Sequence, residues 1–155
     1  MSTFDSLLQK RRKLKDLFPK ILHARTADEQ EDLFACTKAL ISGHMASEEK
    51  DFYKILSPKN RTLKNKIAYA RNGHDEIRHF LTVLEKNHIS YEEWVFTLGE
   101  LKHALSCHLH IEEEIFVLAK KTMKNNEFLQ LIKRVKQAEQ RTFKDLLGIW
   151  AAAPA

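Results

Sequence analysis

Two histidine–glutamate pairs with the same spacing are the residues most able to do chemistry in this chain. His44 and Glu48 lie in "ISGHMASEEKDFY", and His108 and Glu112 lie at the matching positions of "LSCHLHIEEEIFV". Residues i and i+4 share one face of an α-helix, so each pair points to one side of its helix. Imidazole nitrogens and carboxylate oxygens together are typical ligands of iron and manganese. The repeat therefore predicts a metal site built on helices.

Both pairs, and a third histidine, His74, fall on apolar stripes that should face a core. Leu40 and Phe52 flank the first pair at helical spacing, and Leu105 and Ile115 flank the second. A buried carboxylate costs several kcal/mol unless it is paired or bound to metal, so a compensating partner is expected. A metal-free hydrogen-bonded network is the alternative. The predicted metal ligands are His44, Glu48, His74, His108 and Glu112.

Helix signals divide the chain at regular intervals. Thr26 and Ser90 each precede an acidic residue at capping-box spacing, and Ser57 before Pro58 suits another helix start. Pro19 should kink the first helix. We predict helices over about 3–23, 27–56, 59–87, 91–122 and 126–150. The predicted fold is all-α: an antiparallel up-down-up-down four-helix bundle over about 3–122, with an additional C-terminal helix packed across it, in a single domain of residues 1–155.

Composition narrows the class of protein. Apolar residues make up 43% and charged residues 30% of the 155 residues, a globular balance. We expect no membrane span, since no apolar run approaches about 18 residues. Cys36 and Cys107 lie far apart, which favours reduced thiols and a cytoplasmic protein. The net charge of +5 is dispersed, so nucleic-acid binding is not expected. We do not expect an enzyme, because no nucleophile–base pair or phosphate-binding loop is present.

Three segments carry a resemblance to a known family. "LFACTKALISGHMASEEKDFY", "NGHDEIRHFLTVLEK" and "LGELKHALSCHLHIEEEIF" resemble the second, third and fourth helices of hemerythrin-like proteins, the HHE cation-binding domain. The resemblance covers roughly residues 3 to 120. It implies a four-helix bundle that holds an oxo- or hydroxo-bridged di-iron centre on the five ligands named above. It also implies iron, or another divalent transition metal, as cofactor, and dioxygen or nitric oxide as partners.

Arg11 departs from that family pattern. The first helix should supply a histidine, but "QKRRKLKDLF" has Arg11 there, on a stripe with Leu14, Phe18 and Ile21. A guanidinium stays protonated and has no lone pair, so it cannot ligate a cation. It can bind Glu48 or Glu112, or extend outward to water.

Three outcomes for the site remain open because of Arg11. The site is weakened or holds a single metal; or Arg11 neutralises a metal-free core; or water completes a dinuclear centre. The predicted function is non-haem metal binding for handling or sensing oxygen, nitric oxide or iron. The alternative is a metal-free module for protein interaction or regulation, whose protein partner the sequence does not identify.

The remaining candidates are weaker. Glu49 and Glu113 should be solvated, His103 and His110 should lie on the surface, and Cys107 should be a small buried thiol. Tyr53 should pack in the core. The apolar surface of the last helix should come from Leu129, Ile132, Val135, Phe143, Leu146 and Leu147.

Overall fold

The computed structural model describes residues 3–86 and 88–152, and every regular element within them is helical, which confirms the all-α prediction. The side chains of Phe143, Leu146 and Leu147 lie outside the described residues. The elements in chain order are α1 (Thr3–Lys13), the 3₁₀ turn η1 (Leu14–Asp16), α2 (Leu17–Leu22), α3 (Ala27–Ser47), the π-helical turn η2 (Glu48–Phe52), α4 (Tyr53–Leu56), α5 (Arg61–Leu84), α6 (Tyr91–Thr122) and α7 (Asn125–Ala152).

Side-chain caps fix where three of these helices begin. The hydroxyls of Thr26 and Ser90 each accept a hydrogen bond of 3.1 Å from the backbone N–H three residues later, as predicted. The predicted cap at Ser57 is wrong. Instead, the Asn60 side chain accepts a bond of 2.8 Å from the Leu63 N–H, because Ser57 still belongs to the last turn of α4.

The first helical segment changes its winding next to Pro19. The 3₁₀ turn η1 separates α1 from α2 and contains Lys15, the residue four positions before the proline. The proline ring crowds that carbonyl and supplies no N–H, which explains the interruption of regular α-helix here.

The π-helical turn η2 interrupts the second long helix at Glu48 and Glu49. Such turns insert an extra residue and are frequent at functional sites. His44 before η2 and Glu48 at its first residue follow the predicted stripe, but beyond η2 the buried face moves on by one residue. Tyr53 and Leu56 are therefore fully buried, whereas Ile55, which continues the spacing of Glu48 and Phe52, is only partly buried.

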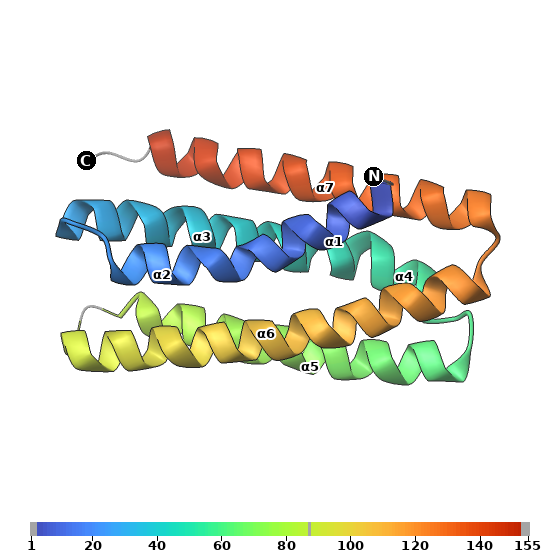
Figure 1. The fold of residues 1–155 in the computed structure, drawn as a ribbon, viewed down its shortest axis with the longest axis horizontal. Coiled ribbons are helices and arrows are strands. Elements are labelled where there is room, and N and C mark those ends of the chain that lie inside the picture. Colours follow the sequence, from blue (N-terminus) through green and yellow to red (C-terminus); the bar gives the residue numbers. More distant parts are fainter. Residues whose placement is uncertain (1–2, 87, 153–155) are drawn as a thin grey trace.

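The helices lie lengthwise beside one another (Figure 1). Helix α2 runs along α3, α1 lies against α7, and α5 runs along α6. Helix α7 also lies lengthwise, mainly against α3, so the prediction that it packs across the bundle is wrong. A 28-residue helix with an apolar stripe over its length buries that stripe best along another long helix. That stripe includes Ile132 and Val135 as predicted, but Phe128 is buried instead of Leu129, which is 38% exposed.

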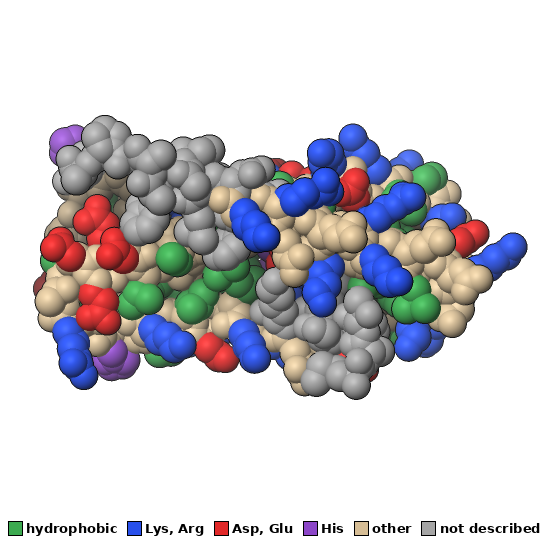
Figure 2. Space-filling model, turned by 90° about the horizontal axis from the view of Figure 1, so that it is seen from above, with side chains coloured by type: hydrophobic (Ala, Val, Ile, Leu, Met, Phe, Trp, Pro, Cys, Tyr) green, Lys and Arg blue, Asp and Glu red, His purple; other side chains and the backbone are tan. Residues whose placement is uncertain are grey.

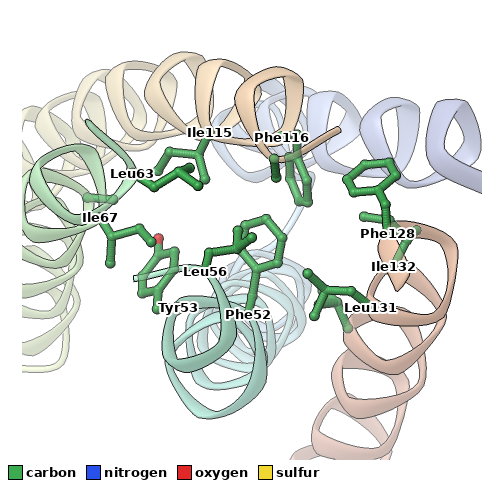
Figure 3. Close-up of a cluster of buried hydrophobic side chains, with 13 residues drawn as sticks. Phe52, Tyr53, Leu56, Leu63, Ile67, Ile115, Phe116, Phe128, Leu131 and Ile132 are labelled. Carbon is green, nitrogen blue, oxygen red and sulfur yellow. The ribbon is translucent and has the colours of Figure 1, made fainter. Parts of the chain in front are cut away.

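Two apolar clusters fill the interior. One joins α4, α5, α6 and the start of α7, and Figure 3 shows the rings of Phe52, Phe116 and Phe128 together within it. The other contains Phe18, Ile41 and further residues of α2, α3, α5 and α6. Along the chain, Glu48, His74 and Glu112 fall between residues of one cluster and residues of the other, and His44 and His108 lie at the edge of the second cluster. The clusters therefore enclose a polar layer.

The surface carries dispersed charge. On the face shown in Figure 2, lysine and arginine side chains are spread along the molecule, and acidic side chains gather toward one end. Among the described residues, no helix combines the length and apolar character needed to cross a membrane.

Candidate metal centre

The five predicted ligands meet in the polar layer. Each is at most 2% exposed, although they come from α3, η2, α5 and α6. Five buried ionisable side chains in one layer would be very costly if they were scattered, so their proximity is the first requirement for stability.

Glu48 lies at the centre of this group. Its Oε1 atom is 3.0 Å from Nε2 of His44, 3.2 Å from Nε2 of His74 and 3.3 Å from Nε2 of His108. The Nε2 atoms of His74 and His108 are themselves only 3.0 Å apart. Three imidazoles thus present the same nitrogen to one carboxylate, each from a different helix.

Glu112 reaches the same space from α6. Its Oε2 atom lies 2.8 Å from Nε2 of His44 and 3.6 Å from Nε2 of His108. One ligand atom from each of His44, Glu48, His108 and Glu112 falls within 4.8 Å of all the others. This spacing suits atoms that share a common ion.

Closeness does not make hydrogen bonds of all these contacts. Nε2 of His44 and Oε2 of Glu112 lie 2.8 Å apart, yet within the described part of the chain both atoms, and Oε2 of Glu48, are buried without a hydrogen-bond partner. Buried polar atoms are rarely left unsatisfied, so each requires an explanation. A cation among them would satisfy all three, and the mixed nitrogen and oxygen donors suit a transition metal. The residues present therefore fit a metal ion.

Glu49 orients His74 and is not simply solvated, contrary to prediction. Its Oε1 atom lies 2.8 Å from Nδ1 of His74, and its Oε2 atom accepts a bond of 2.7 Å from Arg78. When Nδ1 of His74 donates to this carboxylate, its Nε2 carries the lone pair that faces the centre. Burial opposes the charge on Glu49, but the bonds from Arg78 and His74 outweigh it and lower its pKa.

Tyr53 and Gly73 shape the cavity around the histidines. The Tyr53 ring stacks on His74 at 5.5 Å between centroids, and its oxygen lies 3.4 Å from Nε2 of His74. Burial, reinforced by Glu48 and other nearby charges, raises the pKa of Tyr53, so the phenol stays neutral. A Cβ atom at Gly73 would lie 3.3 Å from Nδ1 of His108, so the small residue permits the close approach of α5 and α6. Tyr53 thus lines the centre as well as packing in the core.

Arg11 points inward, which excludes the outward alternative. The residue is 2% exposed, and its Nε donates to Oε1 of Glu112. Its NH1 donates to Oε2 of Glu139 at 2.9 Å, and its Cζ lies 5.4 Å from the centroid of the Phe116 ring. Burial disfavours the guanidinium charge, but Glu112, Glu139 and Glu48 outweigh burial and raise the pKa of Arg11.

Electrostatics within the layer favour charged groups in the absence of metal. Burial disfavours the charged form of His44, but Glu112 and Glu48 outweigh it and raise its pKa to about 10. Burial likewise opposes charge on Glu48, but His44 and the hydrogen-bonded histidines hold its pKa well below the ordinary value. A proton on His44 is therefore favoured without metal, and a metal ion would have to displace it.

The predictions for the weaker candidates are partly correct. His103 and His110 are exposed, as predicted. Cys107 is also exposed, with its Sγ 3.7 Å from Nε2 of His103, so the prediction of a buried thiol is wrong. Glu113 binds Arg12 near the surface.

Sequence reasoning missed Glu139, which is 5% exposed and comes from α7. The signal was present, because Glu139 continues the stripe of Phe128, Ile132 and Val135 in steps of three and four.

The sequence also matches a known family of cation-binding domains. The family model described as the hemerythrin HHE cation binding domain matches residues 3–119. No curated protein and no solved structure gives a significant match to the chain.

Proposed function

Because the chain belongs to the hemerythrin HHE cation-binding domain family, we propose that it binds a transition metal, with iron as the first candidate and another divalent transition metal as the second. The proposed ligands are His44, Glu48, His74, His108 and Glu112. Two observations carry the proposal together: Nε2 of His44, Oε2 of Glu48 and Oε2 of Glu112 are buried and unsatisfied, and His44, Glu48, His108 and Glu112 place ligand atoms within 4.8 Å of one another.

The protein's own groups would prepare the site for such an ion. Glu49 fixes the tautomer of His74, and the pair of apolar clusters excludes water from the polar layer. Bound iron would supply redox-active coordination chemistry, which suits binding of dioxygen or nitric oxide and the handling or sensing of iron. We propose a binding or sensing role rather than an enzyme.

The proposed site is incomplete, because Arg11 stands where the family resemblance implies a histidine. The proposed architecture is the family's antiparallel four-helix bundle with α7 added, as one domain over residues 1–155. The bond between Arg11 of α1 and Glu139 of α7 supports including the C-terminal helix in that domain. The separated free cysteines, Cys36 and Cys107, support a cytoplasmic location.

A metal-free module for protein interaction or regulation is the second candidate. It is favoured by the same Arg11, whose bonds to Glu112 and Glu139 partly neutralise the buried carboxylates without any ion. Under this alternative, the polar layer would serve only to specify how the helices pack.

Metal analysis of matched variants tests the two candidates. We expect protein purified after growth with added iron to contain iron, and His108→Ala to remove most of it. His110→Ala, on the same helix but exposed, should retain the wild-type content. Equal losses in both variants would indicate adventitious surface binding, and wild-type protein without metal would favour the metal-free module.

A further inference from the structure

Arg11 is held in the polar layer by two carboxylates that come from different helices. Its Nε donates to Glu112 of α6, and its NH1 donates to Glu139 of α7. Glu139 lies beyond residues 3–119, the part that matches the family. Among the described residues, Arg11 is the only cation in contact with Glu139. The arginine that departs from the family pattern is therefore paired with a glutamate outside the matched part of the chain.

Arg11 lies on the side of the centre where Glu112 enters. Glu48 Oε1 lies within 3.3 Å of Nε2 of all three histidines. Glu112 contacts Nε2 of His44 through Oε2, and its Oε1 accepts the bond from Arg11. The carboxylate oxygen that would be free to reach a further ion beside Glu112 is thus already occupied.

The charges in the layer also limit how many ions can enter. Among the described residues, the buried carboxylates are Glu48, Glu112 and Glu139, and Arg11 supplies one positive charge beside them. With neutral histidines, two negative charges remain, which one divalent cation balances. A second dication would leave excess positive charge in a low-dielectric interior, beside a guanidinium that cannot lose its proton.

We propose that the ion pair of Arg11 and Glu139 takes the place of a second metal ion, so that this chain holds one divalent cation and not two. Arg11 acts as a built-in cation beside Glu112 and His44, and Glu139 positions it. Helix α7 therefore determines the metal stoichiometry. This inference rests on the proposed function, because it requires the remaining ligands to bind metal.

Titration of the full chain with Co²⁺ under anaerobic conditions tests the inference, with bound cobalt measured by elemental analysis after gel filtration. We expect one ion per wild-type chain and two per Arg11→His chain, because the variant frees Glu112 Oε1 and Glu139 and adds an imidazole. In Arg11→His/Glu139→Gln the second ion should bind more weakly by about tenfold or more. Arg12→His, a matched change at the neighbouring exposed arginine, should leave the count at one.

The outcomes separate this inference from the function on which it rests. Two ions in the wild-type chain, or only one in Arg11→His, would overturn the inference and leave metal binding intact. A wild-type chain that binds none while Arg11→His binds cobalt would also overturn it, because Arg11 would then exclude all metal. If neither protein binds cobalt that His108→Ala removes, the proposed function itself fails. The wild-type titration decides on its own if Arg11→His does not fold.

Discussion

Arg11 and Arg12 are neighbours that make the same kind of bond in opposite environments. Arg11 binds Glu112, and Arg12 binds Glu113, the next residue on α6, at 2.8 Å. The side chains of the first pair are 3% and 1% exposed, whereas those of the second are 58% and 35% exposed. A shift of one residue along each helix thus separates an exposed arginine–glutamate pair from one in the buried polar layer.

The same division separates Glu48 from Glu49 on the π-helical turn. Glu48 is fully buried among three imidazoles, and Glu49 is half-buried and bound to Arg78. We call Arg11, Glu48 and Glu112 the inner set, and Arg12, Glu49 and Glu113 the outer set. Water can replace a lost partner in the outer set, but it cannot reach the inner set. The same kind of ion pair should therefore contribute much more to the free energy of unfolding in the inner set than in the outer set.

The largest expected difference concerns stability. Arg11→Met removes the charge at similar size and leaves Glu112 and Glu139 without it, so the free energy of unfolding should fall by about 3–5 kcal/mol. Arg12→Met should be indistinguishable from wild type, because water solvates Glu113. Urea unfolding at neutral pH with a chelator present measures both.

A double variant checks the reason for that loss. Arg11→Met/Glu139→Met removes one of the two unpaired carboxylates together with the arginine, so it should recover part of the stability lost in Arg11→Met. If the double variant is instead less stable by the sum of the single effects, Arg11 contributes through packing, for example on the Phe116 ring, and not through Glu139.

The helices and the inner ligands were predictable from sequence, because both follow the 3.6-residue period. His44, Glu48, His108 and Glu112 form two pairs with the same spacing on apolar stripes, and this pattern alone predicts that they lie together in the interior. Two other contacts were not predictable in this way. Glu49 reaches His74 from the π-helical turn η2, and no sequence period signals such a turn. Pairing between Arg11 and Glu139 depends on how α7 packs, which local patterns do not fix.

The second prediction compares the glutamates of α6. Glu112→Gln removes a carboxylate from the centre and should lower metal affinity by more than about a hundredfold, beyond the range typical of outer-shell changes. Glu113→Gln should leave the affinity unchanged, because Glu113 binds only Arg12 in the described structure. Competition with a chromophoric chelator measures both constants. A comparable loss in Glu113→Gln would show that net surface charge, not coordination, governs binding.

The third prediction concerns Glu49, the outer residue closest to the ligands. Glu49→Gln weakens the acceptor for Nδ1 of His74 and should reduce metal affinity by about 10- to 100-fold. Arg78→Gln is the matched control: it removes the exposed partner of Glu49 while leaving the bond to His74 intact, so its effect should be smaller. If Arg78→Gln reduced affinity as much as Glu49→Gln, the outer residues would act only through general electrostatics.

The last prediction concerns the pH dependence that the inner carboxylates impose on folding and on metal binding through His44. Glu112 and Glu48 overcome burial and raise the pKa of His44 to about 10 in the metal-free protein, above the ordinary value of 6.5. Because the folded state holds the proton more tightly, this stabilisation is fully present below pH 6.5 and is lost as pH rises through 10. The free energy of unfolding of the metal-free protein should therefore fall across that interval.

Metal binding should show the opposite dependence on pH. A metal requires neutral imidazole, so binding expels the proton from His44, and affinity should rise by about tenfold per pH unit between 6.5 and 10. Calorimetry in two buffers of different ionisation enthalpy counts the protons released. Glu113→Gln should release the same number as wild type, since that outer carboxylate does not contact His44. An affinity independent of pH over this interval would mean that His44 is already neutral, and that the inner carboxylates do not control its charge.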